Sequence, residues 1–164
     1  MIRTRRRFLV TAGAVVGAAM SAAVELSARE RVSAENAWVP WAAPTVEVHA
    51  AYMTIVNRSN EDQSLVSAES PDYQRVELHS SSVKNGVNEM RGLERVAVPA
   101  NNRVTFEPGG LHLMLIGPKR PRAVGDRVRI VLRLQNGEPV EVSAIVRRRN
   151  AESPVGHDHH GAHQ

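Results

Sequence analysis

Four residues, His79, Met90, His112 and Met114, have side chains and spacing that favour a metal site. Their pattern is His-x10-Met-x21-His-x-Met, which offers two imidazole nitrogens and two thioether sulfurs. A thioether is a soft, uncharged donor that favours Cu(I), whereas Ca²⁺ and Mg²⁺ require hard oxygen ligands. The pattern therefore predicts a copper site.

The first pair of donors lies on one short segment of alternating character. His112 and Met114 are two residues apart, so on a β-strand their side chains leave from the same face. The leucines that alternate with them would then face the opposite way, toward a core. This segment predicts a two-donor chelate supported by apolar packing.

The second pair depends on a hairpin. Asn85-Gly86 is a strong signal for a two-residue turn, which would place Ser81 opposite Met90. His79 shares a face with Ser81, so it would become the diagonal neighbour of Met90, within reach of a long side chain. A four-residue loop would change the partners, but a shift of two keeps both residues on one face. Bringing the two pairs together is a tertiary step that the local pattern does not decide.

The remaining candidates are assigned to other roles. Ordinary packing is the alternative for any single His or Met on a strand. Beyond residue 23 only three methionines occur, and two of them belong to the pattern, which favours the metal site. Met53 is predicted in the core. His49 has no Met or His partner at chelating spacing, so we interpret it as an ordinary surface or barrel-end histidine.

Period-2 alternation dominates the chain beyond the export signal at 1–23 and predicts an all-β domain. In residues 126–134 the aliphatic side chains alternate with arginines, as in a half-buried antiparallel strand. Short strands separated by turn signals are typical of a β-sandwich or barrel. The predicted strands are 46–56, 74–79, a pair flanking Asn85-Gly86, 95–98, 103–106, 111–116, 126–134 and 140–148.

Residues 1–23 have the composition of an export signal. Arginines precede an uncharged apolar run from Phe8 to Ala23 that ends in small residues. Arg5 and Arg6 resemble a twin-arginine signal, although a general secretory signal is the alternative, as is an uncleaved anchor. We therefore predict a periplasmic protein with no stable membrane span after cleavage, made of one domain over 24–150 and a disordered tail over 151–164.

Charge and cysteine content exclude several classes. The net charge of +4 comes from the signal: taking its four arginines from the 21 basic residues leaves 17 basic against 17 acidic. The high pI is thus no argument for nucleic-acid binding. Basic residues still gather in 119–133 and 147–149, where solvated strand faces are favoured over a basic docking patch. With no cysteine, the domain has neither a disulfide nor the thiolate of a blue-copper site.

The tail is a second candidate metal segment. It holds four of the seven histidines, and such a flexible polyimidazole segment favours Cu(II), with Zn²⁺ or Ni²⁺ less selectively bound. We expect it to capture oxidised copper and to cooperate with the first site. The alternative is a solvated tail with incidental metal affinity. Its histidines are His157, His159, His160 and His163.

The chain resembles the periplasmic copper chaperones of the PCuAC type, whose copper motif has the same four gaps. The resemblance runs from Ala37 to Val146 and includes residues 51–57, 75–79 and 108–115. Where some members carry Met after the first His, this chain has Ser80. The resemblance implies a cupredoxin-like Greek-key β-barrel or sandwich that binds Cu(I) through the four residues. It also implies copper delivery to the CuA centre of cytochrome c oxidase, directly or through another copper chaperone, by stepwise ligand exchange.

Three other functions remain as alternatives. Copper sequestration or resistance would use the same ligands without an acceptor. An enzyme such as a copper oxidase is disfavoured, because four protein ligands leave little room for substrate and no Ser/His/Asp or paired-carboxylate arrangement stands out. A structural or adhesive β-domain without metal would use Met90 and Met114 for packing alone.

Overall fold

The computed structural model describes residues 31–149. This region contains ten strands and no helix, which confirms the all-β prediction. The predicted signal at 1–23 and the predicted tail at 151–164 lie outside the described residues. The strands are β1 (Val32–Pro40), β2 (Val48–Asn57), β3 (Gln63–Glu69), β4 (Tyr73–Lys84), β5 (Val87–Gly92), β6 (Val96–Val98), β7 (Asn102–Phe106), β8 (Leu111–Pro118), β9 (Arg127–Leu134) and β10 (Pro139–Arg147).

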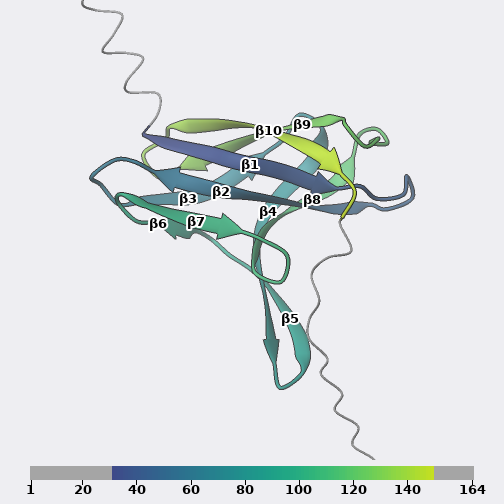
Figure 1. Ribbon diagram of the computed structural model, residues 1–164, viewed down its shortest axis with the longest axis horizontal. Helices are drawn as coiled ribbons and strands as arrows, with labels where there is room; N and C mark the ends of the chain where they lie inside the picture. Colours follow the sequence, from purple (N-terminus) through teal and green to yellow (C-terminus); the bar gives the residue numbers. More distant parts are fainter. Residues whose placement is uncertain (1–30, 150–164) are drawn as a thin grey trace, which may run out of the picture. The chain divides into compact units, whose positions relative to one another are not determined.

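The strands form one curved, open sheet in the order β5-β4-β8-β7-β2-β1-β10-β9-β3-β6, with a further pairing of β8 with β2 (Figure 1). Most neighbours are antiparallel, but β1 runs parallel to β10 and β7 parallel to β8. Strand β2 pairs with β8 through its first half and with β7 through its second half. As a result β8 lies between β4 and β2, and hydrogen bonds to both strands fix its register.

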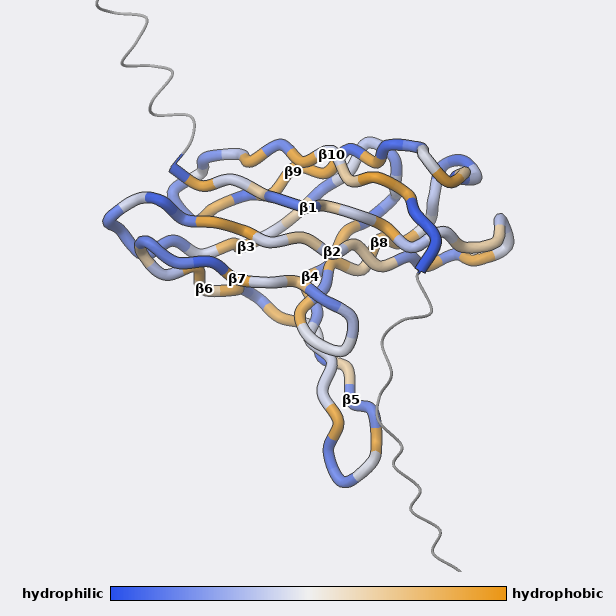
Figure 2. The backbone as a smooth tube through the Cα atoms, in the orientation of Figure 1, coloured by the Kyte–Doolittle hydropathy of each residue, from blue (hydrophilic) through white to orange (hydrophobic). Residues whose placement is uncertain are grey.

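Alternation along the strands separates the core from the solvent. In β9 the residues Val128, Ile130, Leu132 and Leu134 are buried and the arginines between them are exposed, as predicted. Strand β10 repeats this pattern, and the hydropathy along both strands alternates in Figure 2. Met53 is buried in the same core, which confirms its predicted role.

The β4–β5 hairpin has the register that its turn residues predict. Asn85 and Gly86 both have positive φ, 52° and 77°, as a two-residue type I′ turn requires. Ser81 pairs with Met90, and Lys84 pairs with Val87 next to the turn. The tip of this hairpin extends beyond the rest of the sheet in Figure 1. It presents the exposed apolar side chains of Val83, Val87 and Met90.

Two strands, β1 and β3, are absent from the prediction because neither alternates cleanly. In β1 the register with β2 shifts between Glu35 and Trp38, where Asn36 adopts a φ of 54°. A bulge of this kind breaks the period of two on which strand prediction depends. In β3 only Leu65 is buried, and its register with β9 also shifts. Pairing with neighbours, rather than local pattern, defines both strands.

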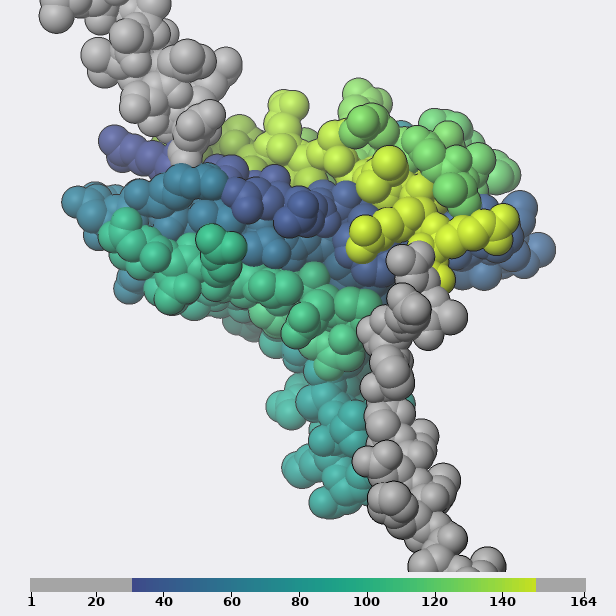
Figure 3. Space-filling model, in the orientation of Figure 1, coloured from purple at the N-terminus to yellow at the C-terminus, as the bar shows by residue number. Residues whose placement is uncertain are grey.

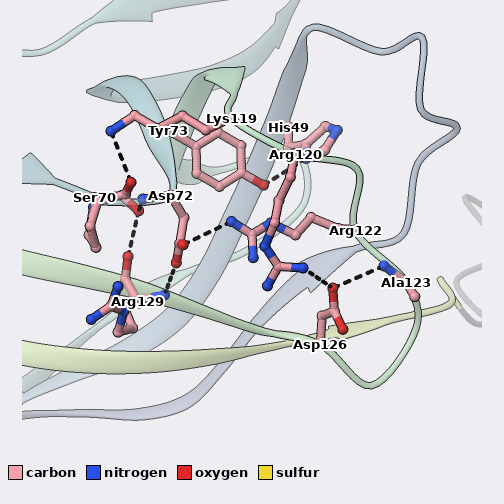
Figure 4. Close-up of polar contacts among 11 residues, drawn as sticks. His49, Ser70, Asp72, Tyr73, Lys119, Arg120, Arg122, Ala123, Asp126 and Arg129 are labelled. Atoms are coloured by element: carbon pink, nitrogen blue, oxygen red, sulfur yellow. Dashed lines mark hydrogen bonds and ion pairs between the residues drawn. The ribbon is translucent and has the colours of Figure 1, made fainter.

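Two predictions about polar residues are wrong. His49 is not a surface histidine: it is buried, and its Nδ1 lies 2.8 Å from the hydroxyl of Tyr73 (Figure 4). Burial lowers the pKa of His49, and the nearby Arg122 guanidinium acts in the same direction. Arg122, in the predicted solvated basic stretch, is also buried, and its Nη2 lies 3.0 Å from Oδ1 of Asp72. The segment that follows β8 folds over this part of the sheet, a long-range contact that local sequence does not encode.

Candidate metal centre

The pairing of β4 with β8 brings the two predicted donor pairs together. His79 is the direct cross-strand partner of His112, and Glu77 is the partner of Met114. The imidazole centroids of His79 and His112 are 5.9 Å apart, with the ring planes at 41°. Metal–imidazole bonds of about 2 Å place two rings on one ion at centroid separations of about 5–6.5 Å. The two histidines therefore stand at a separation that suits a shared metal ion.

The two methionines lie on the same face of this sheet. Met114 is two residues from His112 on β8, while Leu113 and Leu115 between and beyond them are buried in the core. Met90 pairs with Ser81, two residues along β4 from His79, so it is the diagonal neighbour of His79 as predicted. Met90 is 58% exposed because it lies on the projecting hairpin, whereas Met114 is half-buried.

Each histidine already has one ring nitrogen engaged. Nδ1 of His112 lies 3.1 Å from the carbonyl oxygen of Gly110, and a carbonyl only accepts, so Nδ1 carries the proton. Nε2 of His79 lies 3.0 Å from Oε2 of Glu77 and donates to that carboxylate. In the neutral imidazoles, Nε2 of His112 and Nδ1 of His79 are therefore the nitrogens with a free lone pair. Nδ1 of His79 is buried and has no hydrogen-bond partner within the described region.

That arrangement is typical of metal-binding histidines, which usually donate their second N–H to a carboxylate or a backbone carbonyl. Sequence reasoning missed Glu77, although its position two residues before His79 on the same strand face is a signal that could have identified it. The hydrogen bond from His79 holds the pKa of Glu77 below its ordinary value, and Arg75, 2.7 Å from the other carboxylate oxygen, acts in the same direction against partial burial. Glu77 is thus an anion at neutral pH that fixes the tautomer of His79.

An open groove borders one of the four predicted donors, His79. Strands β3 and β4 are not hydrogen-bonded to each other, and the groove between them, with a volume of about 370 Å³, is lined by residues of both strands and by residues 92–94. His79 and Glu77 form part of its wall. Gly92 is the cross-strand partner of His79 and also lines the groove. Within residues 31–149, no three His, Asp or Glu side chains are grouped to hold a metal ion, and the predicted set takes half of its donors from methionine.

The fold is that of PCuAC copper-binding domains. The copper-bound PCuAC domain from PmoF2 superimposes with a TM-score of 0.61 at 22% identity, covering 73% of this chain and 94% of that domain. The solution structure of the Cu(I) form of DR1885 from Deinococcus radiodurans gives a TM-score of 0.59 at 32% identity, covering 72% of this chain and 79% of that one. The resemblance to PCuAC proteins is therefore confirmed for the fold, and the ligand set stays a prediction.

The chain belongs to the LpqE-like family, because residues 32–146 match the family model described as "Putative lipoprotein LpqE-like". A relative named Uncharacterized protein RP573, from Rickettsia prowazekii, is 30% identical over 124 residues, which cover 71% of this chain and 68% of that protein. The family description supports an exported protein. Within the described residues there is no helix long and apolar enough to cross a membrane.

Proposed function

We propose that this protein is a periplasmic copper chaperone, without enzymatic activity of its own, that binds Cu(I) through His79, Met90, His112 and Met114. The observation that carries the proposal is the β4–β8 register, which sets His79 opposite His112 on the face that also holds Met114 and, diagonally, Met90. Two imidazoles and two thioethers form an uncharged set that favours the monovalent ion. The copper-bound domains of the same fold support this assignment.

Delivery by ligand exchange follows from the unequal exposure of the four donors. His112 is buried beside the turn that supplies Gly110, so it stays in place. Met90 lies on an exposed edge hairpin and can be displaced first by an incoming donor from an acceptor protein. A thioether leaves readily because it carries no charge. We propose the CuA centre of cytochrome c oxidase as the final acceptor, reached directly or through another copper chaperone.

We further propose that His157, His159, His160 and His163 form a separate Cu(II)-binding segment that cooperates with the first site. The segment lies outside the described residues, so this part of the proposal depends on composition. A chain that ends at Asn150 should keep its Cu(I) affinity and lose most of its Cu(II) binding. Equal loss of both would contradict two separate sites.

The experiment that tests the main proposal is an anaerobic Cu(I) titration against a colorimetric chelator, followed by incubation of the loaded protein with an apo CuA domain. We expect one tightly bound Cu(I) per chain that ends at Asn150, and copper in the re-isolated CuA domain. Copper that binds tightly but stays on this protein would instead support sequestration. An absence of Cu(I) binding would leave a structural β-domain as the better description.

Glu77→Ala is expected to weaken Cu(I) binding about tenfold to hundredfold, the usual effect of removing an outer partner of a metal-binding histidine. The physical reason is that His79 loses the acceptor that keeps its proton on Nε2. Long-range ¹H–¹⁵N NMR spectra of the apo protein should show His79 changing from one tautomer to a mixture. Glu89→Ala is a matched control, since Glu89 is half-buried on β5 and its carboxylate pairs loosely with Arg91 at 3.9 Å. If Glu77→Ala and Glu89→Ala bind copper equally well, Glu77 has no positioning role.

A further inference from the structure

The connection between β1 and β2 has an unusual composition for an exposed loop. Residues 41–46 of this loop include no charged side chain, and Trp41, at 42% exposure, is followed by the exposed Val46 and Val48. Solvated loops of soluble proteins are mostly polar, and clustered exposed apolar side chains mark a surface that contacts something else. The proposed metal centre does not account for the exposed apolar side chains of loop 41–47 and the start of β2.

Two basic segments lie against this loop. The backbone N–H of Trp41 donates to the carbonyl of Arg147 at 2.8 Å, which joins the loop to the end of β10. The N–H of Gly125 donates to the carbonyl of Val146, also at 2.8 Å, which joins loop 119–126 to the same strand end. Figure 3 shows the end of β10 in yellow beside the green loop 119–126. We call loops 41–47 and 119–126, with residues 127 and 147–149, the basic loop face.

The basic loop face has a strong excess of positive charge. Its acids are Glu47 and Asp126, and Asp126 already pairs with Arg120 at 3.5 Å. Val124 adds an exposed apolar tip between the cations. Arg148 lies over the ring of Trp41 with its guanidinium carbon 5.5 Å from the centroid, so cation and aromatic ring form one surface. The exposed cations are Lys119, Arg120, Arg127, Arg147, Arg148 and Arg149, with Lys119 also donating to the carbonyl of Pro71 at 2.9 Å.

We propose that the basic loop face docks this protein on the surface of an anionic lipid bilayer. The exposed side chains of Trp41, Val46 and Val124 can enter the headgroup region, while the arginines around them pair with lipid phosphates. Positive charge alone would suit both a bilayer and an acidic protein. Exposed tryptophan and valine side chains among the arginines favour the lipid interface. In this proposal, the exposed basic residues that the sequence analysis assigned to solvated strand faces contact lipid phosphates.

Docking in this way leaves the metal centre free. His112 is near the start of β8, and the basic loop face begins just after Pro118 at the end of that strand. Six residues of extended strand separate them by about 20 Å. The exposed hairpin of Met90 stays available to a protein partner while the basic loop face contacts lipid. The proposal does not depend on copper binding.

The test is co-sedimentation of the processed mature chain with vesicles, in EDTA at low salt. We expect binding to vesicles of phosphatidylcholine with one quarter phosphatidylglycerol, little binding to phosphatidylcholine alone, and a blue shift of tryptophan fluorescence on binding. Arg148→Glu with Arg149→Glu should weaken binding at least about 25-fold, since each cation near the surface contributes roughly fivefold. Trp41→Ser with Val46→Ser should weaken binding about tenfold and remove most of the blue shift.

The matched controls make the same kinds of substitution outside the basic loop face. Val83→Ser with Val87→Ser removes exposed apolar side chains from the hairpin, and Arg95→Glu with Arg103→Glu reverses two exposed cations beyond the basic loop face. Both control pairs should bind vesicles like the unaltered chain. Equal loss in the control and test pairs would overturn the proposal, because general charge or hydrophobicity would then explain binding. Absence of vesicle binding together with salt-sensitive binding to polyglutamate would also overturn it, in favour of an acidic protein partner.

Discussion

Replacing Met90 and Met114 together by leucine is expected to weaken Cu(I) binding by at least about 100-fold in a chain that ends at Asn150. Each substitution removes a sulfur ligand, and losing a ligand costs more than the tenfold to hundredfold that an outer partner contributes. Leucine has nearly the volume of methionine, so the fold should lose less than about 1.5 kcal/mol per site. Chelator competition measures the affinity, and chemical denaturation measures the stability.

Met53→Leu is the matched control for this pair. Met53 is buried in the core, away from the face that holds the four donors. The substitution should change the free energy of unfolding by a similar amount and leave Cu(I) affinity unaltered. Full Cu(I) affinity in the double variant would exclude the thioethers as ligands, and with them the proposed centre.

Local physics explains which parts of the donor arrangement are predictable from sequence. The hairpin register follows from two residues, Asn85 and Gly86, whose positive φ angles allow the type I′ turn. Once that register is set, the diagonal placement of His79 and Met90 follows from the period of two. The shared face of His112 and Met114 needs only the alternation of β8. Each of these steps involves residues close in sequence.

The step that joins the pairs is not local. His79 and His112 are opposite each other because β4 pairs with β8, and these strands are linked through the hairpin, β6 and β7. Any even shift of this register would keep the same faces but separate the imidazoles. Tertiary packing selects the register. Leu78, Leu113 and Leu115 are all buried in the core, and the β4–β8 register is the one that lets them pack there together. The meeting of the two donor pairs is thus a consequence of core packing.

The same reasoning explains the error over Arg122. In sequence it belongs to a basic stretch, and an arginine is seldom buried. In the fold its side chain is 2% exposed, and Nη2 pairs with Asp72 in the connection between β3 and β4 (Figure 4). Asp72 is the carboxylate that it pairs with, and the ring centroid of Tyr73 lies 5.9 Å from its guanidinium carbon. Arg122 therefore depends on a single carboxylate for neutralisation.

Asp72→Asn should consequently destabilise the fold by about 3–5 kcal/mol, the usual cost of leaving a buried charge without its partner. Arg122→Met should cost less, because Asp72 is partly exposed and still accepts a hydrogen bond from the backbone N–H of Arg129 at 2.9 Å. The double variant should be more stable than Asp72→Asn alone, since it removes the orphaned cation. Urea denaturation at pH 7 measures all three. If Asp72→Asn and Arg122→Met prove equally mild, the pair contributes little to stability.

The pH dependence of this pair has a definite sign. Burial raises the pKa of Asp72, but the Arg129 N–H and the Arg122 guanidinium outweigh it, so the pKa lies below its ordinary value. A carboxyl with a depressed folded-state pKa stabilises the fold above its unfolded value of about 3.9, and this contribution is lost as the pH falls through the folded-state pKa. The stability difference between the unaltered chain and Asp72→Asn should therefore be constant from pH 7 to 5 and shrink below about pH 4. A difference that grows on acidification would mean that Asp72 is not the anion that balances Arg122.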